Sequence, residues 1–328
     1  MTSTVPFPIA SPGFWRCYWV TARPYLGFVS AAAGLVGLAL PEGASSSAFA
    51  AALAVCFVSY GVGQALTDVF QQDTDALSSP YRPLVRGQIH RRDVLAVSLV
   101  GLAACSLVLV WLAPWALPLC TLAVGGLLVY TPCKRRWWAG PPCNAAVVAL
   151  LPAVGFLCVA PDPDASLHSR PLLSSMVSVF ASYAVFVLLG YFKDISADRA
   201  TGYLTLPIKY GRGASLLVSL VFTLVALVAS GQLLGGSGIF DRNLGAPSLA
   251  ALGLWSAGAL ALVGAHGQML GVSRDDQAHR SITWALRGYL LLHCAEAIAY
   301  RPALLLPCVA GCLLFEAALA GRPERSQI

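Results

Sequence analysis

The sequence predicts an all-α, polytopic integral membrane protein. Hydrophobic residues make up 57% of the 328 residues and charged residues only 11%, and the mean hydropathy is +0.71. A soluble domain does not need so many long apolar runs, whereas a helix that crosses the hydrocarbon needs about 20 consecutive apolar residues. The chain is therefore expected to cross the membrane repeatedly as helices.

Ten apolar runs follow one another along the chain, and most are long enough to span a bilayer, so nine or ten transmembrane helices are expected. The ninth run is a less secure span because it carries Arg287, His293 and Glu296. In it, His293 and Glu296 either line a cavity or pair with Arg287, and we favour structural pairing. The runs cover residues 22–41, 47–66, 93–112, 114–131, 143–161, 171–192, 214–234, 246–270, 281–299 and 302–320.

Basic residues gather in alternate loops, and this pattern predicts the orientation of the chain. The opposite loops carry little beyond Arg170 and Arg242. Because loops rich in Lys and Arg stay on the cytoplasmic side, the basic loops are expected to be cytoplasmic. We expect no nucleic-acid partner. The basic loop residues are Arg82, Arg86, Arg91 and Arg92; Lys134, Arg135 and Arg136; Lys193, Arg199, Lys209 and Arg212; and Arg274 and Arg280.

The first acidic cluster follows the second apolar run, within QALTDVFQQDTDALSSPYRPLVRGQ. On a continuous helix, Asp68, Gln71 and Asp75 would project from one face at i, i+3 and i+7, whereas Asp73 would point elsewhere and be solvated. Oxygen ligands that converge on one face suit Mg²⁺, which takes one or two carboxylates and completes its coordination with water and phosphate. The alternative is a helix end whose charges face water.

A second acidic cluster ends the sixth apolar run, in YFKDISADRATGYLTLPIKYG. Asp194 and Asp198 are spaced i, i+4 on one expected helical face, and Lys193, Arg199 and Lys209 lie near them in sequence. Two acidic clusters at helix ends, each accompanied by basic residues, fit a site that binds a diphosphate through metal ions. Both clusters are expected on the cytoplasmic face, so they can meet.

The loop after the fourth run, TPCKRRWWAGPPCN, is the strongest basic cluster. In one interpretation Lys134 binds the diphosphate, together with Arg135 or Arg136. In the other, basic residues beside Trp137 and Trp138 are simply what a cytoplasmic membrane boundary looks like.

The two acidic clusters resemble the paired aspartate motifs of the UbiA superfamily of intramembrane prenyltransferases, and the first is most similar to the chlorophyll-synthase-like branch. The second motif, DxxxD, is intact as Asp194 and Asp198. The first motif departs from NDxxDxxxD at two positions, where Thr67 replaces Asn and Gln71 replaces the central Asp. The resemblance covers about residues 20 to 215. Its other matches are Arg23-Pro24, Arg82-Pro83, Gly87, Tyr130 through Asn144, Gly202, Thr205, Leu206, Pro207 and Gly211.

The resemblance implies a single domain over residues 1–328, with about nine helices around a central cavity. It implies Mg²⁺-dependent transfer of a prenyl group from a polyprenyl diphosphate to an acceptor in the membrane, an aromatic or other small hydrophobic molecule. The implied catalytic aspartates, which also hold the metal, are Asp68, Asp75, Asp194 and Asp198. Gln71 is expected to assist at the metal, and the further substrate-binding candidates are Arg82, Lys134, Lys193 and Arg199.

Two alternatives remain open at this stage. A terpene cyclase on the same scaffold would ionise the same diphosphate and trap the cation with the substrate's own double bonds. The second alternative, from a different functional class, is a transporter or a non-catalytic lipid-binding protein. Broken helices with charges at the membrane midplane would favour a transporter, whereas these charges lie at helix ends. The changes at Thr67 and Gln71 remove one formal charge from the first motif.

Overall fold

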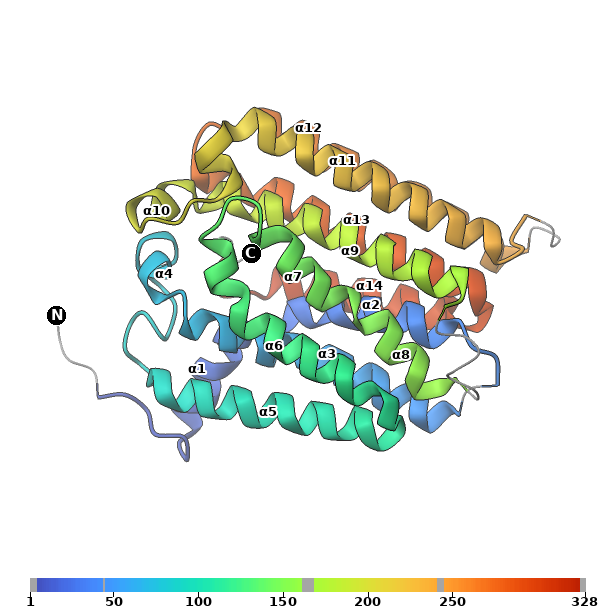
Figure 1. Ribbon diagram of the computed structural model, residues 1–328, viewed down its shortest axis with the longest axis horizontal. Coiled ribbons are helices and arrows are strands. Elements are labelled where there is room, and N and C mark those ends of the chain that lie inside the picture. The colour runs from blue at the N-terminus through green and yellow to red at the C-terminus, as the bar shows by residue number, and fades with distance from the viewer. Residues whose placement is uncertain (1–4, 44, 161–167, 241–244, 325–328) are drawn as a thin grey trace.

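Long helices that run side by side form the body of the protein in this computed structural model, which describes residues 5–43, 45–160, 168–240 and 245–324 (Figure 1). All regular elements in these ranges are helices, so the predicted fold class is confirmed. The longer helices are α3 (Ser46–Val69), α5 (Arg91–Leu112), α6 (Leu117–Lys134), α9 (Arg170–Gly190), α11 (Leu206–Gly236), α12 (Ala246–Leu270), α13 (His279–Tyr300) and α14 (Leu305–Ala320).

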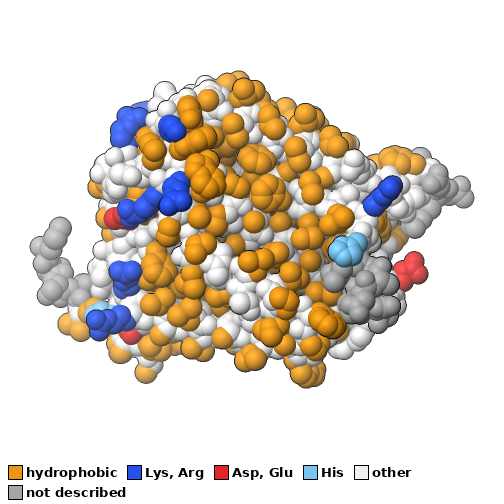
Figure 2. Space-filling view, in the orientation of Figure 1, with side chains coloured by type: hydrophobic (Ala, Val, Ile, Leu, Met, Phe, Trp, Pro, Cys, Tyr) orange, Lys and Arg blue, Asp and Glu red, His pale blue; other side chains and the backbone are white. Residues whose placement is uncertain are grey.

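The shorter helices bend the spans or lie at one end of the bundle. They are α1 (Pro12–Ala22), α2 (Gly27–Ala39), α4 (Gln72–Ser78), α7 (Gly140–Ala149), α8 (Leu151–Val159) and α10 (Ile195–Ala200). Within the described residues, eight helical stretches are long and apolar enough to cross a membrane, and nine if the bent pair α1 and α2 forms one span. Figure 2 shows hydrophobic side chains over the flank of the bundle and Lys and Arg gathered mainly at the end that carries α4 and α10.

The bend between α1 and α2 occurs at Arg23, the residue before Pro24. Proline disfavours a helical conformation in the residue that precedes it, and Arg23 has a left-handed backbone with φ of 50°. The two helices meet at a bend of 43°. This strained corner turns the Arg23 side chain into the bundle, where it is buried.

Both aspartate motifs have the same local structure, a long helix followed by a break and a short helix. The expected continuous helical face through the first motif is wrong, because α3 ends at Val69 and α4 begins only at Gln72. In the second motif, α9 is followed by a 3₁₀ turn, and Asp194 occupies the position just before α10. The short helices α4 and α10 meet through the hydroxyl groups of Thr74 and Thr201, 3.3 Å apart.

A buried polar network joins α9 to α13. Ser182 Oγ lies 3.0 Å from His293 Nε2, His293 Nδ1 lies 2.7 Å from Glu296 Oε2, and Ser178 donates to Glu296 Oε1 at 2.6 Å. The expected pairing with Arg287 is wrong, because the Arg287 guanidinium contacts both carboxylate oxygens of Glu316 on α14 at 2.6 and 2.7 Å. His293 and Glu296 therefore have a structural pairing, with partners on α9.

Candidate active site

A cavity of about 210 Å³ begins where the two motifs meet and extends among the helices. Its polar end contains side chains from both motifs, and its remaining wall is mainly apolar. The polar end is lined by Arg23, Gln64, Thr67, Asp68, Gln71, Asp75, Arg82, Lys134, Lys193 and Asp194, and the apolar wall includes Leu102, Leu109, Leu127, Val147, Val154 and Val187.

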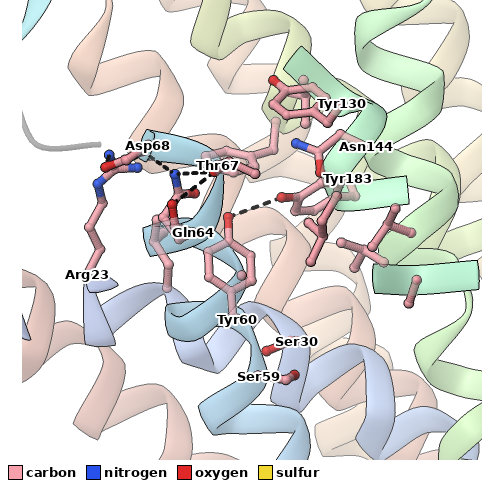
Figure 3. A pocket seen from close by; sticks show the side chains of 18 of the residues that line it. Arg23, Ser30, Ser59, Tyr60, Gln64, Thr67, Asp68, Tyr130, Asn144 and Tyr183 are labelled. Atoms are coloured by element: carbon pink, nitrogen blue, oxygen red, sulfur yellow. Dashed lines mark hydrogen bonds and ion pairs between the residues drawn. The ribbon is translucent and has the colours of Figure 1, made fainter. Parts of the chain in front are cut away.

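Asp68, at the end of α3, is held by donors on both carboxylate oxygens. Arg23 Nη2 donates to Oδ2 at 2.6 Å, and Gln64 Nε2 donates to Oδ1 at 2.8 Å (Figure 3). Arg82 Nη1 lies 3.5 Å from Oδ1. The sequence reasoning assigned no role to Arg23 or Gln64, although Arg23-Pro24 belonged to the resemblance.

Arg82 links Asp68 to Asp75, because its guanidinium also contacts the Asp75 carboxylate. Burial raises the pKa of Asp75, and the positive charge of Arg82 opposes that shift. Burial alone would lower the pKa of Arg82, but Asp68 and Asp75 raise it above its ordinary value. Arg82 therefore stays charged between the two acids of the first motif.

Lys134, at the end of α6, contacts both motifs. Its Nζ lies 3.3 Å from Asp198 Oδ1 and 3.9 Å from Asp194 Oδ2, and it donates to Gln71 Oε1 at 3.3 Å. Lys193 Nζ lies 3.4 Å from Asp194 Oδ1. The site thus balances four carboxylates with four basic side chains, namely Asp68, Asp75, Asp194 and Asp198 against Arg23, Arg82, Lys134 and Lys193.

The two acids of the second motif have opposite pKa shifts. Burial raises the pKa of Asp198 to about 7, and the Asp194 charge adds to this shift while Lys134 opposes it. Burial would also raise the pKa of Asp194, but Lys193, Lys134 and Arg82 lower it below its ordinary value. A proton and a cation can therefore compete for Asp198 near neutral pH.

The oxygen ligands present fit Mg²⁺, most clearly at the second motif. Both carboxylate oxygens of Asp198 are buried, and neither accepts a hydrogen bond of good geometry from the described part of the chain. In the first motif, all three oxygen ligands have partners: Asp68 accepts from Arg23 and Gln64, Asp75 contacts Arg82, and Gln71 accepts from Lys134. No three Asp, Glu, His or Cys side chains converge within the described ranges, but Mg²⁺ needs only one or two carboxylates when phosphate oxygens complete its coordination.

Two of the site candidates, Asp198 and Arg199, are absent from the cavity lining. Asp198 is fully buried and contacts the cavity-lining Lys134 at 3.3 Å. The Arg199 side chain is exposed and lies in a surface depression with Arg212 and Asp275. Asp73 is exposed as expected, and it contacts Arg135 at 2.9 Å rather than the cavity.

Comparisons with known proteins agree with this geometry. The profile of the UbiA prenyltransferase family matches residues 27–286. A digeranylgeranylglyceryl phosphate synthase of Natronomonas pharaonis is 33% identical over 208 residues, which cover 62% of this chain and 73% of that protein. The chloroplastic chlorophyll synthase of Oryza sativa subsp. japonica is 30% identical over 164 residues, 46% of this chain and 42% of that protein.

Solved structures share the fold. A UbiA homolog from Archaeoglobus fulgidus bound to DMAPP and Mg²⁺ superposes with a TM-score of 0.62 at 16% identity, covering 92% of this chain and 96% of that one. A UbiA homolog from Aeropyrum pernix K1 superposes with a TM-score of 0.65 at 20% identity, covering 86% of this chain and 97% of that one. The chain therefore belongs to the UbiA prenyltransferase family, and it is a prenyltransferase that acts on diphosphate substrates.

Proposed function

We propose that this enzyme transfers a prenyl group from a polyprenyl diphosphate to an aromatic or other small hydrophobic acceptor within the membrane, and that the reaction requires Mg²⁺. The observation that carries this proposal is the position of Lys134, which contacts residues of both motifs at the polar end of a mainly apolar cavity. We infer that one domain over residues 1–328 performs this function, and the profile match over residues 27–286 supports the inference.

The charge distribution supports one orientation of the bound prenyl donor. A diphosphate needs cations and hydrogen-bond donors, and Arg82, Lys134 and Lys193 supply both at the polar end. The apolar wall suits a hydrocarbon tail, because moving the tail away from water or lipid headgroups lowers its free energy. The donor would therefore place its diphosphate among the aspartate motifs and its tail along α5, α6 and α8.

Asp194 and Asp198, together with Asp75, Gln71 and Asp68, would hold Mg²⁺ in this enzyme. The Archaeoglobus fulgidus homolog bound to DMAPP and Mg²⁺ supports a role for Mg²⁺ in this family. When bound, the metal neutralises charge on the diphosphate and makes it a better leaving group. Because Arg82 contacts Asp68 and Asp75 in the structure, its guanidinium is placed to pass from these carboxylates to an incoming diphosphate.

The chain's own cations act on the leaving group. As the bond between the allylic carbon and the diphosphate oxygen breaks, negative charge grows on that oxygen and positive charge on the carbon. Lys134 and Lys193 lie where they stabilise the departing diphosphate. The electron pair of the acceptor then forms the new bond to carbon, and the acceptor loses its proton. The names of the relatives, a digeranylgeranylglyceryl phosphate synthase and a chlorophyll synthase, support a membrane-soluble acceptor.

The motif end of the bundle is proposed to face the cytoplasm. Lys and Arg side chains gather at this end in the described part of the chain (Figure 2), and basic loops are retained on the cytoplasmic side. A water-soluble diphosphate head group would then reach the site from the cytoplasm.

The test is diphosphate release by purified protein in detergent. Geranyl, farnesyl and geranylgeranyl diphosphates are supplied with and without Mg²⁺, first alone and then with a pool of hydrophobic acceptors. We expect Mg²⁺-dependent release that increases when acceptors are added. Release without acceptor that yields a cyclic hydrocarbon or alcohol would instead show a terpene cyclase. No release under any of these conditions would contradict the proposed function.

A further inference from the structure

Two tyrosines cross the cavity and bond to each other. Tyr60 on α3 and Tyr183 on α9 both line the cavity, and their hydroxyl oxygens lie 3.1 Å apart. In Figure 3 this contact lies between Thr67 and Asp68 on one side and Ser30 and Ser59 on the other. The pair is therefore a bridge between opposite walls, at a level below the aspartate motifs.

The depth of this bridge follows from helix geometry. On the continuous helix α3, Tyr60 precedes Gln64 by four residues and Asp68 by eight. At a rise of about 1.5 Å per residue, the bridge lies roughly 6 Å below Gln64 and roughly 12 Å below Asp68. Each hydroxyl oxygen has the other as a hydrogen-bond partner, so an apolar tail packed against the bridge does not leave both groups unpaired.

The cavity continues past this level, where α5 and α6 supply part of its lining. Cys120 on α6 lines it fourteen residues before Lys134, which corresponds to roughly 21 Å along the helix. Leu102 and Leu109 of α5 also line it. A short tail can thus lie above the bridge, whereas a longer tail has to turn toward α5 and α6.

The Tyr183 end of the bridge is fixed from behind. The Tyr289 ring packs edge-on against the Tyr183 ring, with centroids 6.2 Å apart. The neighbouring residue, Ser182, is hydrogen-bonded to His293 of the buried network. Because α9 is held to α13 at this point, the backbone that carries Tyr183 cannot shift without disrupting buried polar contacts.

We propose that the Tyr60–Tyr183 bridge determines which prenyl chain lengths the enzyme accepts, by blocking the direct path of the tail and diverting longer tails toward α5 and α6. This inference rests on the proposed function and names a specificity determinant within the same cavity. Removing either ring opens a direct path, and longer donors gain more from it than shorter donors do.

The experiment compares the kcat/KM values of geranyl, farnesyl and geranylgeranyl diphosphates in the wild type and in Tyr60→Ala and Tyr183→Ala. We expect the ratio of geranylgeranyl to geranyl activity to rise by about tenfold or more. Tyr60→Phe keeps the ring and loses only the hydroxyl, so its ratio should change by less than about threefold. Tyr18→Ala removes another buried tyrosine, which is bonded to Ser98 outside the cavity lining, and should leave the ratio unchanged.

A binding measurement distinguishes failure of the bridge as a specificity determinant from failure of the proposed function. Thermal shifts with the non-hydrolysable thiodiphosphate analogues of the same three donors give a preference that needs no acceptor and no turnover. Tyr60→Leu serves as a second variant if an alanine variant does not fold. An unchanged preference in folded Tyr60→Ala and Tyr60→Leu would overturn the bridge as a specificity determinant. A wild type that binds the analogues but releases no diphosphate would contradict the proposed function and leave the bridge test intact.

Discussion

The ammonium group of Lys134 lies 3.3 Å from Asp198 Oδ1 and the same distance from Gln71 Oε1, so one side chain contacts both aspartate motifs. The two motifs are separated by more than a hundred residues in sequence. Lys134 therefore links the two motifs electrostatically, and under the proposed function it is one of the cations that would bind the diphosphate.

Replacing Lys134 with Met should reduce kcat/KM for diphosphate release by about a hundredfold or more, because a preorganised cation is lost where negative charge develops. The variant should still fold, since protonation of Asp198 relieves the unpaired charge. The measurement is steady-state diphosphate release with geranylgeranyl diphosphate. Lys209→Met is the matched control, because the exposed Lys209 packs over the Trp137 ring. Equal activities of the two variants would contradict the role of Lys134.

Asp194→Asn should abolish turnover while the protein remains folded, because the amide keeps the size of the side chain but no longer offers a charged ligand. The matched control is Asp73→Asn, whose side chain is exposed and contacts Arg135. Diphosphate release is measured together with the size-exclusion profile in detergent. Near-normal release by Asp194→Asn would rule out the second motif as the catalytic centre.

Hydropathy and motif spacing predicted most of this architecture. Apolar runs alone predicted the all-α membrane fold class and nearly all of the membrane-spanning helices, because a membrane helix must be apolar over its whole length. They could not predict the breaks at Phe70 and Asp194, which depend on how α4 and α10 pack on each other. Local sequence favoured a continuous helix in the first motif, and tertiary contacts determined the outcome.

Site residues were predictable where an ionisable side chain lies beside an apolar run, and they were less predictable elsewhere. Asp194 and Lys134 stood out because ionisable groups beside apolar runs are costly, and the structure places both in the cavity lining. Arg199 was grouped with them by sequence proximity alone, although its direction on α10 takes it to the surface. Tyr60 and Tyr183 gave no signal, because an aromatic residue in a membrane helix resembles any other until its partner across the cavity is known.

Glu296→Ala should destabilise the protein by about 3 kcal/mol, because it leaves His293 and Ser178 without their partner inside the bundle. The measurement is thermal or denaturant unfolding in detergent. Asp276→Ala is the control, since its contact with Arg274 is largely exposed, and exposed ion pairs contribute less than about 1 kcal/mol. Equal stabilities of the two variants would show that the buried network does not hold α9 to α13.

The raised pKa of Asp198 predicts how stability depends on pH when no metal is bound. Its pKa is about 7 in the folded protein and 3.8 for an unperturbed aspartate. In that window the folded state holds a proton that the unfolded chain has released, so the free energy of unfolding falls as pH rises from about 4 to about 7. Asp198→Asn cannot titrate, and its stability should fall less over the same range.

Mg²⁺ should reverse this trend, because a cation binds the deprotonated Asp198 and competes with its proton. The increase in Tm on adding Mg²⁺ should therefore be larger at about pH 8 than at about pH 6 in the wild type. In Asp198→Asn the increase should be smaller at both pH values and nearly independent of pH. The readout is thermal unfolding in detergent with matched ionic strength, and it needs no substrate. A Mg²⁺ effect of equal size at the two pH values in the wild type would mean that Asp198 is not a ligand, and the metal would then have to bind through Asp194 and the first motif alone.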